Sequence, residues 1–231
     1  GPYLLTPKTD GMVVAWELDS PMKSTLSYGT SADAMQTLDV AVEEGEAFQG
    51  KPMHMYRARL TGLTPDTKYV YEVKAENGQS VQGSFRTLPT DPEEIRFVVV
   101  SDSHRFETAE QVSAAITKFD PHFILHTGDT VEGTGSQKDQ FVYWFRNAGD
   151  FLHNVPVIYN SGNHDYGVYF DEYISKTQKE QYHSNENGRN VSFNVGGLHI
   201  TMMDSNPWSL FELNSSSGGT VDAATRKLVD D

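Results

Sequence analysis

The sequence predicts an all-β sandwich followed by an α/β sandwich, and two patterns carry this prediction. Through residues 1–88, apolar residues alternate with polar ones, which is the period of half-buried antiparallel strands. From residue 95 onward, apolar runs at 95–100, 123–125 and 156–158 are separated by helical stretches. This β-α-β-α-β order is typical of a parallel sheet covered by helices. We therefore expect one domain at 1–88, a linker at 89–94 and a second domain at 95–231.

In the first domain, each predicted strand presents its apolar side chains on one face. The alternation is clearest in Met12, Val14, Trp16 and Leu18, in Tyr56, Ala58 and Leu60, in Tyr69, Tyr71 and Val73, and in Val81, Gly83 and Phe85. A turn at 63–68 directly before Tyr69 is the pattern of a tyrosine corner, in which the hydroxyl returns to the backbone. With Trp16 early in the domain, this part resembles a fibronectin type III sandwich. A generic β-sandwich belongs to the same fold class.

Two helices and a hairpin are predicted after the linker, whose prolines and acidic residues favour an extended path. Apolar residues at helical spacing predict helices at 108–119 and at about 137–152, the first of them ending at Asp120 and Pro121. Alternation on both sides of Gly196 and Gly197 predicts a hairpin that begins a second sheet. A further helix is predicted from residue 221.

Composition restricts the partners and the metal chemistry. The 231 residues carry a net charge of −14, which argues against binding to a nucleic-acid backbone. An anionic substrate would need bound cations. There is no cysteine, so a metal would be held by oxygen and nitrogen ligands. No apolar stretch approaches the roughly 20 residues that cross a bilayer.

Three polar motifs follow the three apolar runs directly. They are Asp102-Ser103-His104, Gly128-Asp129 and Gly162-Asn163-His164-Asp165. The carboxyl ends of parallel strands share one crevice, so these side chains can converge there. Carboxylate, imidazole and amide oxygen together indicate a metal site. Taken singly, each motif has an ordinary alternative: a solvated strand-end loop, a turn, or helix capping by Asn163 or Asp165.

The three motifs together resemble the signature of the calcineurin-like metallophosphoesterase superfamily. Joined to a fibronectin-like domain, they resemble its purple acid phosphatase branch. The resemblance implies a phosphatase or phosphodiesterase with a dinuclear metal centre and a metal-bound hydroxide. Asp129 would bridge two divalent ions of manganese, zinc or iron, Asp102 and His104 would bind the first, and Asn163 would bind the second. His164 would contact the phosphate and assist the leaving group, and Asp165 would hold its ring.

This sequence departs from the family pattern in two places. Purple acid phosphatases have a glycine and an iron-binding tyrosine where His104 and Glu132 stand here, so no iron(III)-tyrosinate centre is expected. The later histidine blocks of the family are absent, and His183 and His199 do not fit them. We therefore expect the natural protein to continue past residue 231, and this fragment to be inactive or weakly active. The alternative is a non-catalytic module that binds a protein or glycan.

The resemblance also bears on partners and location. It implies a small phosphoester substrate and a secreted or periplasmic protein. An incomplete second domain would leave the strands at 191–203 partly uncovered. Self-association or local disorder is therefore expected near the C-terminus. Asp204 and Asn206 follow the hairpin, and the sequence leaves open whether they approach the cleft and assigns them no role.

Overall fold

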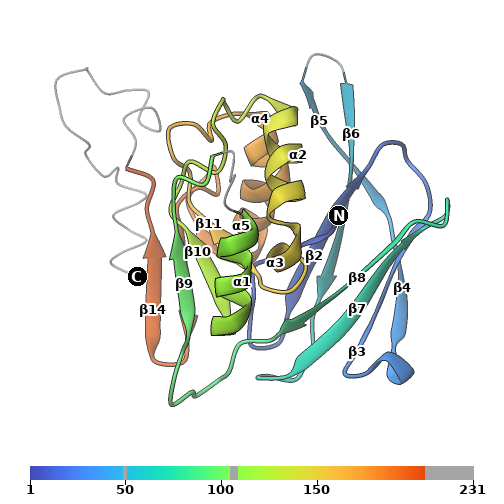
Figure 1. Ribbon diagram of the computed structural model, residues 1–231, viewed down its shortest axis with the longest axis vertical. Coiled ribbons are helices and arrows are strands. Elements are labelled where there is room, and N and C mark those ends of the chain that lie inside the picture. The colour runs from blue at the N-terminus through green and yellow to red at the C-terminus, as the bar shows by residue number, and fades with distance from the viewer. Residues whose placement is uncertain (49–50, 105–108, 206–231) are drawn as a thin grey trace.

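The computed structural model describes residues 1–48, 51–104 and 109–205, and the predicted helix from residue 221 lies outside them. The first part is a sandwich of two antiparallel layers (Figure 1). One layer contains β1 (Tyr3–Leu5), β2 (Met12–Leu18), β5 (Val42–Phe48) and β6 (Lys51–Leu60). The other contains β3 (Ser24–Gly29), β4 (Gln36–Val40), β7 (Lys68–Ala75) and β8 (Ser80–Arg86). A short 3-10 helix, η1 (Ala32–Ala34), joins β3 to β4.

The alternation predicted the core of this sandwich correctly. Trp16 is 2% exposed, and its ring stacks on Tyr56 with centroids 5.5 Å apart. The tyrosine corner is also present, because the Thr64 N–H donates to the Tyr69 hydroxyl at 3.0 Å. Removal of these large aromatic surfaces from water is the main stabilising contribution of this layer pair.

The second part contains the predicted parallel sheet. Strands β9 (Phe97–Val100), β10 (Phe123–His126) and β11 (Val157–Tyr159) pair in parallel, as the three apolar runs predict. The first predicted helix is α1 (Ala109–Phe119), whose expected first residue lies outside the described part of the chain. Asp120 follows it with a positive φ of 51°, which ends the helix before Pro121.

The second predicted helix is interrupted, which corrects the sequence prediction. It consists of α2 (Lys138–Asn147) and α3 (Gly149–Leu152). Ala148 between them has φ −91° and ψ 0°, outside the helical region. Gly149 follows, and glycine is a weak helix former. The break still leaves Phe141, Trp144 and Leu152 fully buried, so the predicted apolar stripe is present.

The remaining elements complete the layers. After β11 come α4 (Val168–Phe170), the π-helix η2 (Asp171–Ser175) and α5 (Lys176–Gln181). The predicted hairpin is β13 (Val191–Val195) and β14 (Leu198–Met202), and β12 (His183–Ser184) adds a third strand to this second sheet. The sequence predicts uncovered apolar surface near the C-terminus. Among the described residues of this region, Leu198 and Met203 are 41% and 40% exposed. Self-association through this surface stays a prediction.

One sheet runs through both parts of the chain, which the sequence pattern did not indicate. β1 pairs antiparallel with β2 on one side and parallel with β11 on the other, giving the order β5-β6-β2-β1-β11-β10-β9 (Figure 1). One face of this sheet packs against helices from the second part, and its other face is covered by the four-stranded and three-stranded sheets. The domain boundary at 89–94 stays a prediction, since the two parts share this sheet.

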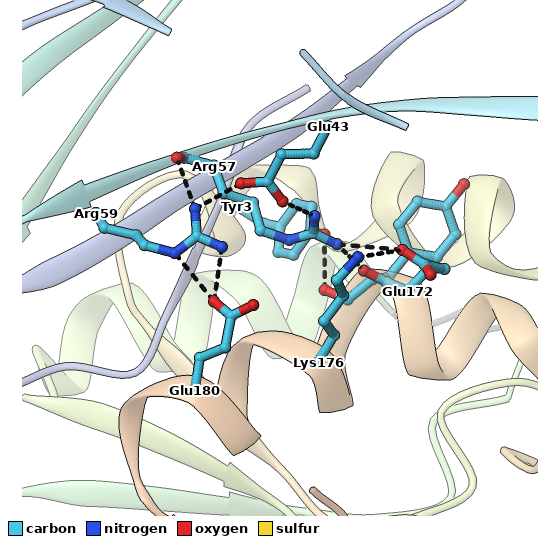
Figure 2. Close-up of polar contacts among 8 residues, drawn as sticks. Tyr3, Glu43, Arg57, Arg59, Glu172, Lys176 and Glu180 are labelled. Atoms are coloured by element: carbon cyan, nitrogen blue, oxygen red, sulfur yellow. Dashed lines mark hydrogen bonds and ion pairs between the residues drawn. The ribbon is translucent and has the colours of Figure 1, made fainter. Parts of the chain in front are cut away.

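Ion pairs also join the two parts (Figure 2). Arg57 and Arg59 lie on β6, and both bind Glu43 of β5, at 2.5 and 2.6 Å. Arg57 also donates to the main-chain oxygen of Glu172 in η2, and Arg59 binds Glu180 of α5 at 2.6 Å. The Arg57 side chain is completely buried. We call these four side chains and Glu172 the junction network, and it links the first part to the helices that follow β11.

Candidate metal centre

The predicted motifs lie at one edge of the sheet. Asp102 and His104 follow β9, Asp129 follows β10, and residues 162–165 follow β11. Because the three strands are parallel and adjacent, their carboxyl ends meet there. The arrangement of this edge is therefore a direct consequence of the strand order.

Three of the predicted ligands come together. One potential ligand atom from each of Asp102, His104 and Asp129 lies within 4.8 Å of the other two. The His104 Nε2 and the Asp102 Oδ1 are 3.8 Å apart. Two carboxylates and one imidazole at this spacing can share a divalent cation, and oxygen and nitrogen donors suit manganese, zinc or iron. The donor set therefore fits the metals that the sequence predicts.

The backbone of these ligands is strained. Asp102, His104 and Asp129 have φ values of 49°, 43° and 54°, in the left-handed region that residues other than glycine rarely adopt. Main-chain bonds keep the first two loops together: the Asp102 N–H donates to Gly128 and the His104 N–H to Asp129, at 3.0 and 3.2 Å. Such strain often accompanies functional sites, where it fixes side chains in one direction.

Both histidines of the site have one ring nitrogen held by a main-chain carbonyl. The Nδ1 of His104 lies 3.2 Å from the Val131 oxygen, and the Nδ1 of His164 lies 3.0 Å from the Gly133 oxygen. A carbonyl only accepts, so each Nδ1 carries the proton, which makes Nε2 the nitrogen for a metal or a substrate. The main-chain N–H of His164 also donates to the Asp129 Oδ1 at 3.0 Å.

Asn163 lies beside the group but is exposed. With Asp102 and Asp129 it lines a cleft of about 520 Å³, whose apolar wall includes Val99, Ile200 and Met202. Gly162 precedes it, and a Cβ at that position would collide with the Asp129 carboxylate. The glycine therefore permits the close approach of the second and third loops.

Asp165 occupies a different position from the one expected. The ring of His164 is held by Gly133, whereas Asp165 is completely buried and accepts the N–H groups of Thr130 and Gly162, both at 2.9 Å. Burial raises the pKa of Asp165 to about 7, and these two N–H donors oppose the rise. Its carboxyl thus joins the second and third loops rather than orienting the histidine ring.

Two further groups support the loops. His126 is fully buried, its Nε2 lies 2.8 Å from the Ser103 hydroxyl, and burial lowers its pKa to about 3. Asp204, just after β14, accepts the Ser161 hydroxyl at 2.6 Å and the Tyr166 hydroxyl. The sequence left open whether Asp204 approaches the cleft. Asp204 is only 7% exposed, and burial of a carboxylate is the structural feature that indicates a role for it. Asn206 lies outside the described residues.

Family comparisons agree with this architecture. The model of "Purple acid Phosphatase, N-terminal domain" matches residues 3–87, and the model of "Calcineurin-like phosphoesterase" matches residues 95–220. The fold and the second match define a chain of the metallophosphoesterase class. The chain belongs to the calcineurin-like phosphoesterase family.

Solved structures show the same fold. Purple acid phosphatase PPD1 from yellow lupin (Lupinus luteus) seeds has a TM-score of 0.66 and 16% identity, over 91% of this chain and 47% of that one. PhoD has a TM-score of 0.58 and 14% identity, over 89% of this chain and 51% of that one. At these identities the likeness concerns the fold alone.

Curated relatives are longer than this chain. Two uncharacterized proteins of Mycobacterium tuberculosis, from strains CDC 1551 / Oshkosh and H37Rv, are 26% identical over 176 residues, which is 67% of this chain and 33% of each relative. The chain thus spans about a third of their length. Among the described residues, no helix is both long and apolar enough to cross a bilayer.

Proposed function

We propose that the complete protein hydrolyses phosphoesters with divalent metal ions held at the carboxyl edge of β9, β10 and β11. The observation that carries this proposal is the grouping of Asp102, His104 and Asp129 within 4.8 Å. Among the described residues, no arginine or lysine pairs with either carboxylate, and Asp102 has His104 as its ion-pair partner at 3.8 Å. Two carboxylates this close repel each other, so a bound cation would stabilise the group.

Each residue has a distinct proposed part. Asp129 would bridge two ions, Asp102 and His104 would bind the first, and Asn163 would bind the second. When bound, such ions activate water and offset the negative charge that accumulates on a phosphoryl group during its transfer. They would also reduce the repulsion between the phosphate and a chain of net charge −14.

His164 is the proposed proton donor. Its Nδ1 donates to the Gly133 carbonyl, so the ring is held in one orientation and Nε2 is the nitrogen that can carry a transferable proton. When Nε2 is protonated, it can donate that proton to the departing oxygen. Asp165 would hold the Thr130 and Gly162 backbone together, and so keep Asp129 and Asn163 at a constant separation. Choice between monoesters and diesters, and export from the cytoplasm, remain predictions from family resemblance.

Metal binding and hydrolysis test the proposal together. Asp129→Asn in the complete protein keeps an oxygen that can accept the main-chain N–H of His164 but removes the negative charge. Manganese affinity should therefore fall more than about 100-fold, which exceeds the usual effect of losing a residue that only hydrogen-bonds to a metal ligand. Hydrolysis of an aryl phosphate should fall with it. The matched control is Asp139→Asn, which changes an exposed carboxylate in the first turn of α2. Hydrolysis by Asp129→Asn at the unaltered rate would reject the assignment.

A further inference from the structure

A second cavity lies at the opposite edge of the same three strands. It has a volume of about 350 Å³ and is formed between β7 and β8 on one side and the segments 116–122 and 151–156 on the other. Arg96, His122 and Pro156 directly precede β9, β10 and β11, so the cavity lies at their amino ends. The metal centre lies at their carboxyl ends, about 13 Å away along four-residue strands. The two sites are therefore separate.

Positive charge collects in this cavity, although the chain as a whole is acidic. Lys68, Arg86 and Arg96 line it, against one lining carboxylate, Asp120. Lys68 and Arg86 stand directly opposite each other on β7 and β8. Like charges in that position destabilise a strand pair, so the arrangement has an energetic cost that an anion between them would remove.

The three cations are only partly neutralised by the protein. Among the described residues, the Arg86 guanidinium contacts Asp66 at 3.1 Å, and the Arg96 guanidinium contacts Asp120 and the main-chain oxygen of Phe119, both at 3.4 Å. A guanidinium has five N–H donors, so most of these donors stay available. Within the described part of the chain, no hydrogen bond or ion pair involves the Lys68 ammonium group.

The floor of the cavity is apolar and its walls are fixed. Phe85, Ile116 and Phe151 are each at most 3% exposed and lie among its lining residues. The two walls are joined by Ser84, whose N–H and hydroxyl both donate to Asn154 Oδ1, at 3.0 and 3.1 Å. A preformed cavity with an apolar floor and a few convergent polar groups is typical of a small-molecule site.

We propose that this cavity binds a small organic anion, with a phosphate or carboxylate group held by Lys68, Arg86 and Arg96 and an apolar body against the hydrocarbon stems of these three side chains. Inorganic phosphate carries the charge without the apolar body and should bind more weakly than phenylphosphonate. Phenylacetate carries the same apolar body with a carboxylate. Comparison of the three probes therefore identifies which anionic group the cavity prefers.

The test is a titration of the full 231-residue chain, in the presence of a metal chelator so that the metal centre does not compete. Phenylphosphonate should bind saturably at one site and shift the amide signals of Arg86, Arg96 and His122. Lys68→Gln should weaken binding about tenfold, the loss of one charge-assisted hydrogen bond. Lys74→Gln removes the same charge from the other end of β7, at a residue that does not line the cavity, and should leave the affinity unchanged.

Three results would overturn this proposal. They are the absence of saturable binding for all three probes, an equal loss of affinity in the Lys68 and Lys74 variants, and amide shifts confined to residues 102, 129 and 163. Both lysines are exposed, so Lys74→Gln should unfold at the same temperature as the unaltered chain, and Lys68→Gln, which relieves the repulsion with Arg86, should unfold at the same or a slightly higher temperature. That measurement separates loss of binding from loss of the fold.

Discussion

The metal centre and the junction network both collect carboxylates, but they treat the negative charge in opposite ways. In the junction network Glu43, Glu172 and Glu180 each lie within 4 Å of an arginine nitrogen. At the metal centre Asp102 and Asp129 lie beside each other, with His104 as their close basic neighbour among the described residues. The three glutamates of the first group are balanced by its two arginines together with Lys176, which lies 3.6 Å from Glu172, whereas the two carboxylates of the second have an excess of negative charge that a cation would offset.

The two groups also differ in backbone conformation. Arg57 and Arg59 lie in regular β structure, while all three grouped ligands have positive φ values. Regular backbone with paired charges holds the two parts of the chain together. Strained backbone brings together two carboxylates that have no lysine or arginine partner within the described part of the chain, which is the arrangement expected of the proposed cation site. The comparison therefore separates structural polar clusters from functional ones by charge balance and backbone conformation.

The largest effect should come from breaking the junction network at its buried end. Arg57→Ala leaves Glu43 with one arginine and leaves the main-chain oxygen of Glu172 without this donor. Loss of one partner from a buried pair should lower the free energy of unfolding by about 3–5 kcal/mol. Urea denaturation measures this, with Arg146→Ala, an exposed arginine in the last turn of α2, as the control. Equal effects of the two variants would contradict the structural role of the network.

The metal centre should respond in the opposite way to loss of a charge. Asp129→Asn relieves repulsion with Asp102, so the metal-free protein should become more stable by about 1 kcal/mol or less. Manganese at 100 times its dissociation constant should stabilise the unaltered protein by about 2.7 kcal/mol, and this gain should disappear in the variant. Thermal unfolding with and without manganese measures both the expected gain in metal-free stability and the expected loss of stabilisation by the metal. A variant that is destabilised without metal would mean that Asp129 has a structural role.

Asp204 should have an intermediate effect, because it contacts the third loop and is not one of the proposed ligands. Asp204→Ala removes the acceptor of the Ser161 and Tyr166 hydroxyls. Manganese affinity should fall about tenfold, which is the smaller of the losses expected when a residue that supports the metal ligands is removed. Calorimetric titration measures the affinity, with Asp150→Ala, an exposed residue of α3, as the control. An unchanged affinity would show that the third loop keeps its position without this support.

The smallest effect should be the acid dependence of the junction network. Burial raises the pKa of Glu43, but hydrogen bonds from Arg59 and Arg57 outweigh it and hold the pKa below its usual value of 4.5. The stability that Glu43 contributes is therefore present above pH 4.5 and is lost as the pH falls through the folded-state pKa. The difference in unfolding free energy between the unaltered chain and Glu43→Gln should narrow over that range. Glu94→Gln, an exposed glutamate, should show no such change.

Most of the fold could be predicted from local patterns. Period-two alternation located β2, β6, β7, β8 and the β13–β14 hairpin, and the three apolar runs located β9, β10 and β11. These predictions succeed because side-chain periodicity depends on the local backbone. The order of polar motifs after parallel strands also indicated that Asp102, His104 and Asp129 would converge.

Predictions failed where a residue's partner lies far along the chain. The pairing of β1 with β11 and the N–H group that Thr130 donates to Asp165 leave no periodic signal. The break at Ala148 is a different case, because the neighbouring Gly149 is a local signal that the prediction from the apolar stripe did not use. By itself, the sequence determined the elements and the donor chemistry of the metal centre, since both follow from residue type and spacing. The tertiary structure alone decided the shared sheet, the ring nitrogens that face carbonyls and the basic cavity. Those features depend on which distant backbone and side-chain groups meet when the layers pack.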